Sequence, residues 1–246
     1  MNQGTRRFSI LGVFLLSAVL ALETGCATHQ QYRSFTTPTP LPPNNYLILG
    51  FMAGREAWDN DQRPVRKMAL RLRALNLPGV HLETIENKER DLAIQLVRRA
   101  LDRNGDGKLD PQELASARVI LYGHSFGGAA VVKLARQLKQ MGVPVLLTVQ
   151  VDSVGRDDQV IPSNVARAAN FYQQNGLLIR GRPAIRAEDP QKTIIVGNFK
   201  YDYTHKDVDR SGMPAYENIF AVAHAKIASD PEVWAKVQEL IVGEIK

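Results

Sequence analysis

One short segment of the chain carries a serine in the setting that nucleophilic catalysis needs. The pentapeptide Gly123-His124-Ser125-Phe126-Gly127 follows an apolar run and precedes a stretch of small residues. A sharp turn between a strand and a helix would present the hydroxyl of Ser125, and the flanking glycines leave room for such a turn. A serine hydroxyl is a poor nucleophile and needs a base, usually a histidine that a carboxylate orients. The segment therefore predicts covalent chemistry if a histidine and an acid lie nearby.

A second segment has the composition of a calcium-binding loop. Residues 102–113 match the pattern Asp-x-[Asp/Asn]-x-[Asp/Asn]-Gly-x5-Glu at every fixed position. Oxygen atoms are the ligands that Ca²⁺ prefers, and Gly107 permits the sharp turn at the centre of the loop. The expected ligands are Asp102, Asn104, Asp106, the carbonyl of Lys108, Asp110 and Glu113. Because the loop comes shortly before the Ser125 turn, we expect bound calcium to be structural and to fix the connection into that turn.

Strands and helices are predicted to alternate around these two segments. Apolar runs indicate buried strands at 46–49, 119–122, 145–151 and 193–196, and 219–222 is a further candidate. Alternation of apolar and polar residues indicates another strand at 80–85. Helical spacing of apolar residues indicates helices at 65–75, 92–101, 129–141 and 231–241. Residues 155–191 are expected to lie over the strand ends or to hold a crossover helix. The alternation predicts an α/β fold, with a doubly wound, mostly parallel sheet and helices on both faces.

The strand, the pentapeptide and the following helix resemble the nucleophile elbow of the α/β-hydrolase superfamily of serine esterases, lipases and thioesterases. The resemblance covers roughly residues 45–246, so we expect one compact hydrolase domain over 46–246 that contains the calcium loop. It implies that Ser125 is the nucleophile and that the Phe126 amide is one oxyanion donor. The loop after the first strand would supply the second donor, from Phe51 or Met52. The implied activity is hydrolysis of a carboxylic ester or thioester, with acyl-lipids among the candidate substrates.

The superfamily order of serine, acid and histidine narrows the choice of the other catalytic residues. His224, before the last predicted helix, resembles the C-terminal histidine of many members, and His205 is the alternative. Asp152 directly follows a predicted strand and is the expected acid. In relatives whose acid follows the next strand, the corresponding residue would be Asp202. The expected triad is Ser125, Asp152 and His224, and it requires no cofactor.

Residues 1–25 resemble a bacterial export signal. A pair of arginines precedes an uncharged apolar stretch at 8–22, which is shorter than the roughly 20 residues of a membrane-spanning helix. The sequence before Cys26 resembles a lipoprotein cleavage site, and ordinary cleavage after Ala27 is the alternative. Residues 26–45 are rich in proline and threonine and are expected to form a tether. We therefore expect an exported protein of the cell envelope, either periplasmic or anchored by lipid at Cys26, and secreted if Cys26 is not acylated.

The overall composition excludes several classes of protein. The 246-residue chain is 44% hydrophobic and 23% charged, which argues against disorder. Its single cysteine excludes an intrachain disulfide. The net charge of +6 is spread along the chain, so nucleic acid is not an expected partner. The expected partners are a small-molecule or lipid ester and, through Cys26, a membrane. The alternative hypothesis is a non-catalytic, calcium-binding envelope protein on a hydrolase scaffold.

Overall fold

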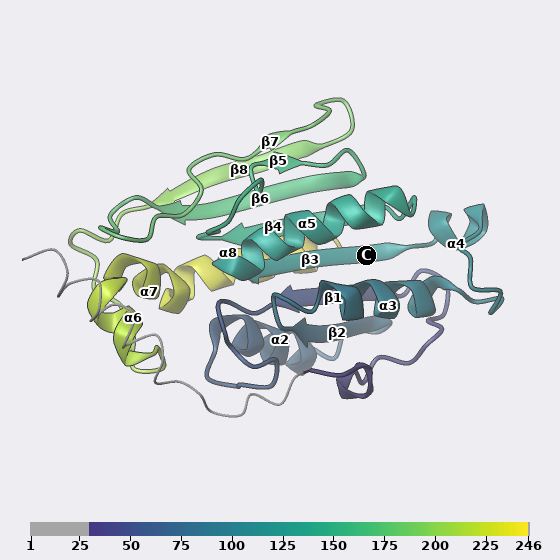
Figure 1. Cartoon of the computed structure of the whole chain (residues 1–246), viewed down its shortest axis with the longest axis horizontal. Coiled ribbons are helices and arrows are strands. Elements are labelled where there is room, and N and C mark those ends of the chain that lie inside the picture. Colours follow the sequence, from purple (N-terminus) through teal and green to yellow (C-terminus); the bar gives the residue numbers. More distant parts are fainter. Residues whose placement is uncertain (1–29, 246) are drawn as a thin grey trace, which may run out of the picture.

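A six-stranded sheet forms the centre of the computed structural model, which describes residues 30–245. Its strand order is β2-β1-β3-β4-β6-β8, and all its pairings are parallel (Figure 1). The strands are β1 (Tyr46–Phe51), β2 (Val80–Ile85), β3 (Arg118–His124), β4 (Val145–Val151), β6 (Val165–Gln173) and β8 (Ile194–Tyr201). From β1 the chain turns one way to β2 and then crosses back to β3, so the sheet is doubly wound. The predicted α/β fold class is confirmed.

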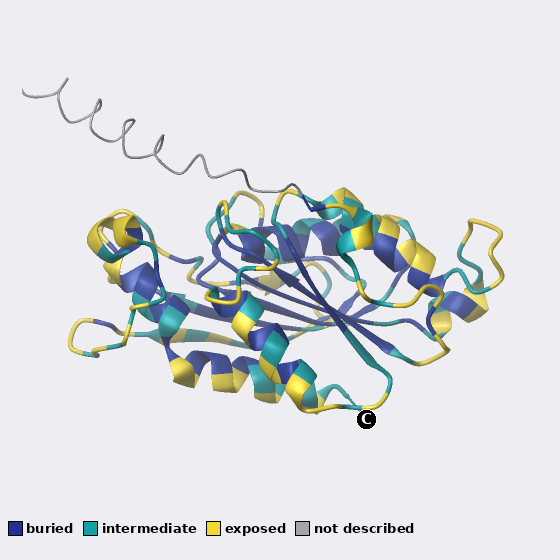
Figure 2. Ribbon diagram, turned by 90° about the horizontal axis from the view of Figure 1, so that it is seen from below, coloured by how far each residue is buried: buried dark blue, intermediate teal, exposed yellow. Residues whose placement is uncertain are grey.

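Helices cover both faces of this sheet, and their buried sides face it (Figures 1 and 2). Helices α3 (Arg90–Leu101) and α5 (Phe126–Gln140) pack on one face, and α2 (Pro64–Ala74) and α8 (Pro231–Gly243) pack on the other. Each face has its own cluster of buried apolar side chains. The remaining elements are the 3-10 helix η1 (Tyr32–Ser34), α4 (Pro111–Ala115), β5 (Val160–Ile161), β7 (Arg186–Ala187), α6 (Ala215–Phe220) and α7 (Val222–Ser229). The arrangement brings the loops that follow the strands together at the carboxyl edge of the sheet, where such folds bind ligands.

Two of the sequence-based expectations need correction. Residues 155–191 contain a central strand, β6, and no crossover helix. Its sequence, which includes Ala-Arg-Ala-Ala, has few of the residues that favour strands, and pairing with β4 and β8 on either side sets its conformation. The candidate strand at 219–222 is wrong, because these residues end α6 and begin α7. A short apolar run does not distinguish a strand from a helix by periodicity.

The proline- and threonine-rich segment packs against the domain from Gln30 onward. The amides and hydroxyls of Thr36 and Thr37 all donate to one oxygen of buried Glu83, over 2.7–3.1 Å. Further along, the Leu41 amide donates to a carbonyl of α3 at 2.8 Å, and its side chain is buried. Residues 30–45 therefore form a strap that lies on the domain.

The predicted export signal and Cys26 lie outside the described residues and stay predictions. Within residues 30–245, no helix has both the length and the apolar character needed to cross a membrane.

Candidate active site

Ser125 lies in a sharp turn between β3 and α5, at the carboxyl edge of the sheet. Its backbone has φ 56° and ψ −122°, a conformation that residues with side chains rarely adopt. The Ser125 amide donates to the Val151 carbonyl at 3.0 Å, and the Ser125 carbonyl accepts from the amides of Gly128 and Val154 at 3.0 and 3.1 Å. These bonds hold the strained turn in place, and the serine is only 6% exposed. The structure thus has the elbow conformation that the sequence predicts.

Close backbone contacts explain the glycines around this turn. A Cβ atom on Gly123 would lie 2.5 Å from the backbone of Gly127. A Cβ atom on Gly127 would overlap the carbonyl oxygen of Phe51, at the end of β1. Neither position has room for a side chain, so α5 begins directly against the ends of β1 and β3.

The structure brings the predicted acid and base together, although they lie far apart in sequence. Nδ1 of His224 lies 2.6 Å from Oδ2 of Asp152, and both residues are buried. The same carboxylate accepts from the amide of Gln173 at 3.0 Å and from its side-chain Nε2 at 2.9 Å. A carboxylate only accepts hydrogen bonds, so this contact places the imidazole proton on Nδ1. The Nε2 atom of His224 is then the nitrogen that can act as a base.

A second imidazole, that of His124, lies against His224. The two rings stack with their centroids 4.7 Å apart and their planes 25° apart. Neither ring nitrogen of His124 has a hydrogen-bond partner among the described residues. Burial, with a smaller effect of neighbouring His224, lowers the pKa of His124 well below its usual value. His124 therefore acts as a neutral surface that holds the His224 ring next to the serine turn.

Among residues 30–245, the structure has no hydrogen bond between the Ser125 hydroxyl and the His224 imidazole. The stack with His124 nevertheless places His224 beside the residue that directly precedes the serine. In a protein without substrate, the distance between a catalytic serine and its base is often too long for a hydrogen bond, and it shortens when substrate binds.

The loop after β1 narrows the choice of the second oxyanion donor. The Met52 amide donates to the Ile85 carbonyl at 2.9 Å, so this bond already occupies it. Phe51 lies within β1 and is paired with both neighbouring strands. Phe126 is the first residue of α5, where amide groups have no partner within the helix. The Phe126 amide thus suits the predicted role, and a donor from Phe51 stays a prediction.

A carboxyl group that the sequence analysis did not identify lies close to this site. Glu56, in the loop after β1, accepts a hydrogen bond from the Ala53 amide at 3.0 Å and lies 3.6 Å from Nε of Arg63. Burial raises the pKa of Glu56 to about 7; Arg63 opposes this rise and Glu217 adds to it. His224 is close enough to influence the same carboxyl group. No motif distinguishes Glu56 from the surface acids of the chain, because its burial arises from tertiary packing.

The alternative catalytic residues, His205 and Asp202, are exposed, whereas the Asp152–His224 pair is buried. His205 is exposed in the loop after β8. Asp202, also exposed, accepts from the Thr204 amide at 2.8 Å and from the side chain of Asn175 at 2.9 Å. Neither shares a hydrogen bond with the pair among the described residues.

The predicted calcium loop directs its side chains to its own backbone. Asp102 accepts from the amides of Gly105 and Gly107 at 2.8 and 2.9 Å. Glu113, which is buried, accepts from three backbone amides of the loop, at 2.6–3.2 Å. Both glycines have positive φ angles, as a sharp turn requires.

The remaining expected side-chain ligands follow the same pattern. Asn104, Asp106 and Asp110 each accept from the amide two residues further along, and the Lys108 carbonyl stays a predicted ligand. No group of three or more His, Cys, Asp and Glu side chains in the described part of the chain is placed to hold a metal ion. The helix that leaves the loop, α4, has only five residues. The turn is therefore held by hydrogen bonds, and calcium binding stays a prediction.

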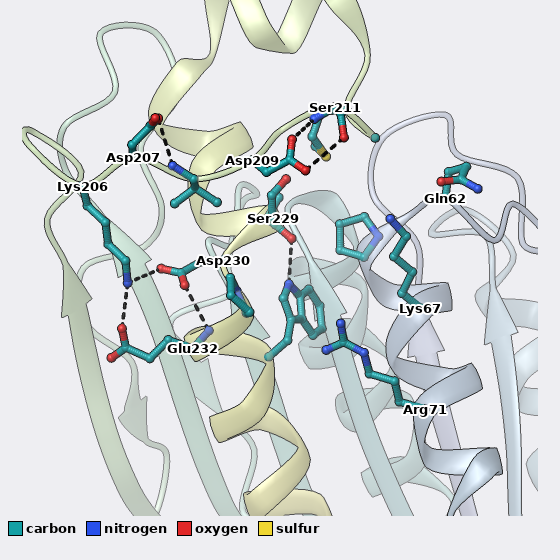
Figure 3. A pocket seen from close by; sticks show the side chains of 17 residues that line it. Gln62, Lys67, Arg71, Lys206, Asp207, Asp209, Ser211, Ser229, Asp230 and Glu232 are labelled. Atoms are coloured by element: carbon teal, nitrogen blue, oxygen red, sulfur yellow. Dashed lines mark hydrogen bonds and ion pairs between the residues drawn. The ribbon is translucent and has the colours of Figure 1, made fainter.

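A pocket of about 590 Å³ lies between α2 and the start of α8 (Figure 3). Lys67 and Arg71 line one side, and Lys206 on the other side contacts Asp230 and Glu232 at 2.8 and 2.7 Å. None of the predicted triad residues lines this pocket. Asp230 caps α8, and both Asp230 and Glu232 pair with Lys206, which is a structural role.

Comparisons with known proteins identify solved structures but no family. Neither a protein-family model nor a curated protein matches the chain. A cutinase-like protein from Cryptococcus sp. is 14% identical with a TM-score of 0.45, over 85% of this chain and 98% of that one. The thioesterase domain of the nocardicin cluster is 14% identical with a TM-score of 0.42, over 82% and 94%. A dienelactone hydrolase-like phosphotriesterase from metagenomic libraries is 17% identical with a TM-score of 0.41, over 84% and 88%. These values do not assign a family, so the function must be argued from the residues of this chain.

Proposed function

We propose that the chain is an exported serine hydrolase of the α/β-hydrolase type, which cleaves a carboxylic ester or thioester. The observation that carries this proposal is the buried hydrogen bond between Asp152 and His224, beside a serine in a strained turn. A buried carboxylate and an imidazole at the carboxyl edge of a parallel sheet are the groups that a serine needs for activation.

In this mechanism the Ser125 oxygen attacks the carbonyl carbon of the substrate while Nε2 of His224 takes the hydroxyl proton. The negative charge that develops on the carbonyl oxygen is stabilised by the Phe126 amide and a donor from the loop after β1. His224 then gives its proton to the departing alcohol or thiol, which leaves an acyl group on Ser125. A water molecule, deprotonated by His224, releases the acid and restores the serine.

Other side chains keep the base in position. Asp152 holds the proton on Nδ1 of His224 and stabilises the imidazolium ion that forms during each step. Gln173 fixes the Asp152 carboxylate through two hydrogen bonds. His124 limits the rotation of the His224 ring through stacking. These contacts align the base without touching the substrate, so they are positioning interactions.

A fluorophosphonate probe tests the proposal, because it labels only an activated serine. We expect labelling of the wild-type chain, loss of labelling in Ser125→Ala and in His224→Ala, and full labelling in His205→Ala, the matched control. Hydrolysis of p-nitrophenyl esters of increasing acyl length should follow the same order and would define the acyl preference. Folded wild-type chain that takes no label would overturn the proposal in favour of a non-catalytic calcium-binding envelope protein.

A further inference from the structure

Helix α6 has an inverted burial pattern. Tyr216, Ile219 and Phe220, at i, i+3 and i+4, share one face of the helix and are 43%, 67% and 48% exposed. The residue that the helix buries is Glu217, which is 8% exposed. A helix on the surface of a globular domain normally buries its apolar stripe and exposes its charges. We call Tyr216, Ile219, Phe220 and the adjoining, 39% exposed Val222 the α6 face.

The α6 face lies at the end of the molecule that carries the candidate active site. Helix α6 leads directly into α7, which contains His224, and both lie at the end toward which β6 and β8 point (Figure 1). Three more exposed apolar side chains follow strands at this edge, namely Phe126, Leu177 and Leu178. Among the described residues, the other large apolar side chains with high exposure are Leu75 and Ile194, at the opposite edge. Exposed apolar surface is thus concentrated at the carboxyl edge of the sheet, where Ser125 lies, and patches of this kind mark interaction sites.

The undescribed part of the chain joins the domain at the same edge. The Gln30 side chain donates to the Thr84 carbonyl at 2.9 Å and accepts from the Glu86 amide at 3.1 Å, at the carboxyl end of β2. The 29 preceding residues include the apolar stretch 8–22 and Cys26. Four extended residues span at most about 14 Å, so a lipid on Cys26 would lie close to this edge.

We propose that the α6 face docks on a lipid bilayer and turns the carboxyl edge of the sheet, where Ser125 lies, toward esters in the membrane. The purpose of this surface rests on the proposed ester hydrolysis. Its apolar side chains suit the boundary between headgroups and acyl chains, where amphipathic helices lie. The net charge is +6 for the whole chain and +5 without residues 1–25, which contain Arg6, Arg7 and Glu23, and either value favours approach to anionic lipids.

Quenching by brominated lipid tests this docking without any turnover of substrate. The full-length chain carrying Phe220→Trp is mixed with vesicles of phosphatidylcholine and phosphatidylglycerol that contain acyl-brominated phosphatidylcholine. The emission of Trp58 and Trp234, measured on the unsubstituted chain, is subtracted. Ile194→Trp is the matched control, because Ile194 is similarly exposed but lies at the opposite edge. The N-terminal residues are identical in both variants, so their own affinity for lipid contributes equally.

We expect bromine to remove most of the added emission in Phe220→Trp and little of it in Ile194→Trp. Ile219→Trp gives a second measurement on the same face if circular dichroism shows that Phe220→Trp does not fold. Equal quenching at both edges, or none at the α6 face, would overturn the proposal. Absence of quenching with a doubled mass in light scattering would assign the face to a second copy of the chain and would equally overturn it. Failure of the ester assay alone leaves this quenching result unaffected, so the two proposals fail separately.

Discussion

The acidic loop lies directly before β3 and the Ser125 turn directly after it, and the hydrogen bonding of their polar groups differs. In the acidic loop before β3, the side-chain oxygens are bonded to backbone amides. In the turn after β3, Ser125 has a strained backbone, and the neighbouring imidazole of His124 has no hydrogen-bond partner among the described residues. Satisfied polar groups stabilise a fold, whereas strain and unpaired buried groups tend to occur where chemistry takes place. From this comparison we expect a stabilising role at one end of β3 and the proposed catalysis at the other.

The largest expected effect is a loss of activity that occurs for a substitution in the candidate active site and not for one in the acidic loop. Asp152→Asn should lower kcat/KM by about 10⁴-fold, because an amide does not hold His224 in the tautomer that can accept the serine proton. Asparagine tolerates the positive φ of 44° at this position, so the backbone should be kept. The matched change in the acidic loop, Asp102→Asn, should leave kcat/KM unchanged. Similar losses in both variants, measured with a p-nitrophenyl ester, would remove the distinction.

The next effect concerns Glu56 and the dependence of stability on pH. Burial raises its pKa from 4.5 to about 7 in the folded chain, so between these values the folded state keeps a proton that the unfolded state has lost. Stability is therefore fully present below about pH 4.5 and decreases as pH rises through 7, by about 3 kcal/mol in total. Urea unfolding across this range should show the decrease in the wild type and a smaller one in Glu56→Gln. Identical slopes would show that another group is responsible.

Calcium binding would show that the acidic loop is stabilised by more than its own hydrogen bonds. If the acidic loop binds calcium, the ion should raise the free energy of unfolding by about 2.7 kcal/mol at a concentration a hundredfold above Kd. Thermal unfolding with calcium and with a chelator would measure this difference, and Glu113→Gln should abolish it. Coincident curves for the wild type would contradict the calcium prediction and leave the loop as a hydrogen-bonded turn.

The smallest effect tests the hydrogen bonds of the acidic loop itself. The Asp110 side chain accepts from the amides of Gln112 and Glu113 at 2.7 and 2.8 Å and caps α4. Asp110→Ala should lower the free energy of unfolding by about 1 kcal/mol, whereas Asp110→Asn should keep most of the cap. Esterase activity should not change in either variant. A loss of activity without loss of stability would link the loop to catalysis.

The parts of the molecule that local sequence determines were predicted well. Strands β1, β3 and β4 are mostly apolar, β2 alternates between apolar and polar residues, and the turn at Ser125 has glycines that backbone contacts require. The contact of Asp152 with His224 was expected from resemblance, and no local pattern in the chain contains it.

What the sequence did not reveal depends on tertiary packing. Strand β6 has weak strand preference and is defined by its two neighbours in the sheet. Gln173, which fixes the carboxylate of Asp152, lies at the end of this strand and was missed with it. Glu56 resembles any surface acid in the sequence, because its burial and its closeness to Arg63 arise only when the chain folds.

The strap also determines where the folded unit begins. Repeating strands and helices start at Tyr46, which suggests a boundary there. A chain shortened to that residue would lose the four hydrogen bonds from Thr36 and Thr37, and Arg73, 3.6 Å away, would be the remaining ion-pair partner of buried Glu83. Burying a charge without adequate partners is costly, and β2 is the strand at the margin of the sheet. Recombinant forms that begin at Tyr46 should therefore be prone to misfolding and to pairing along β2.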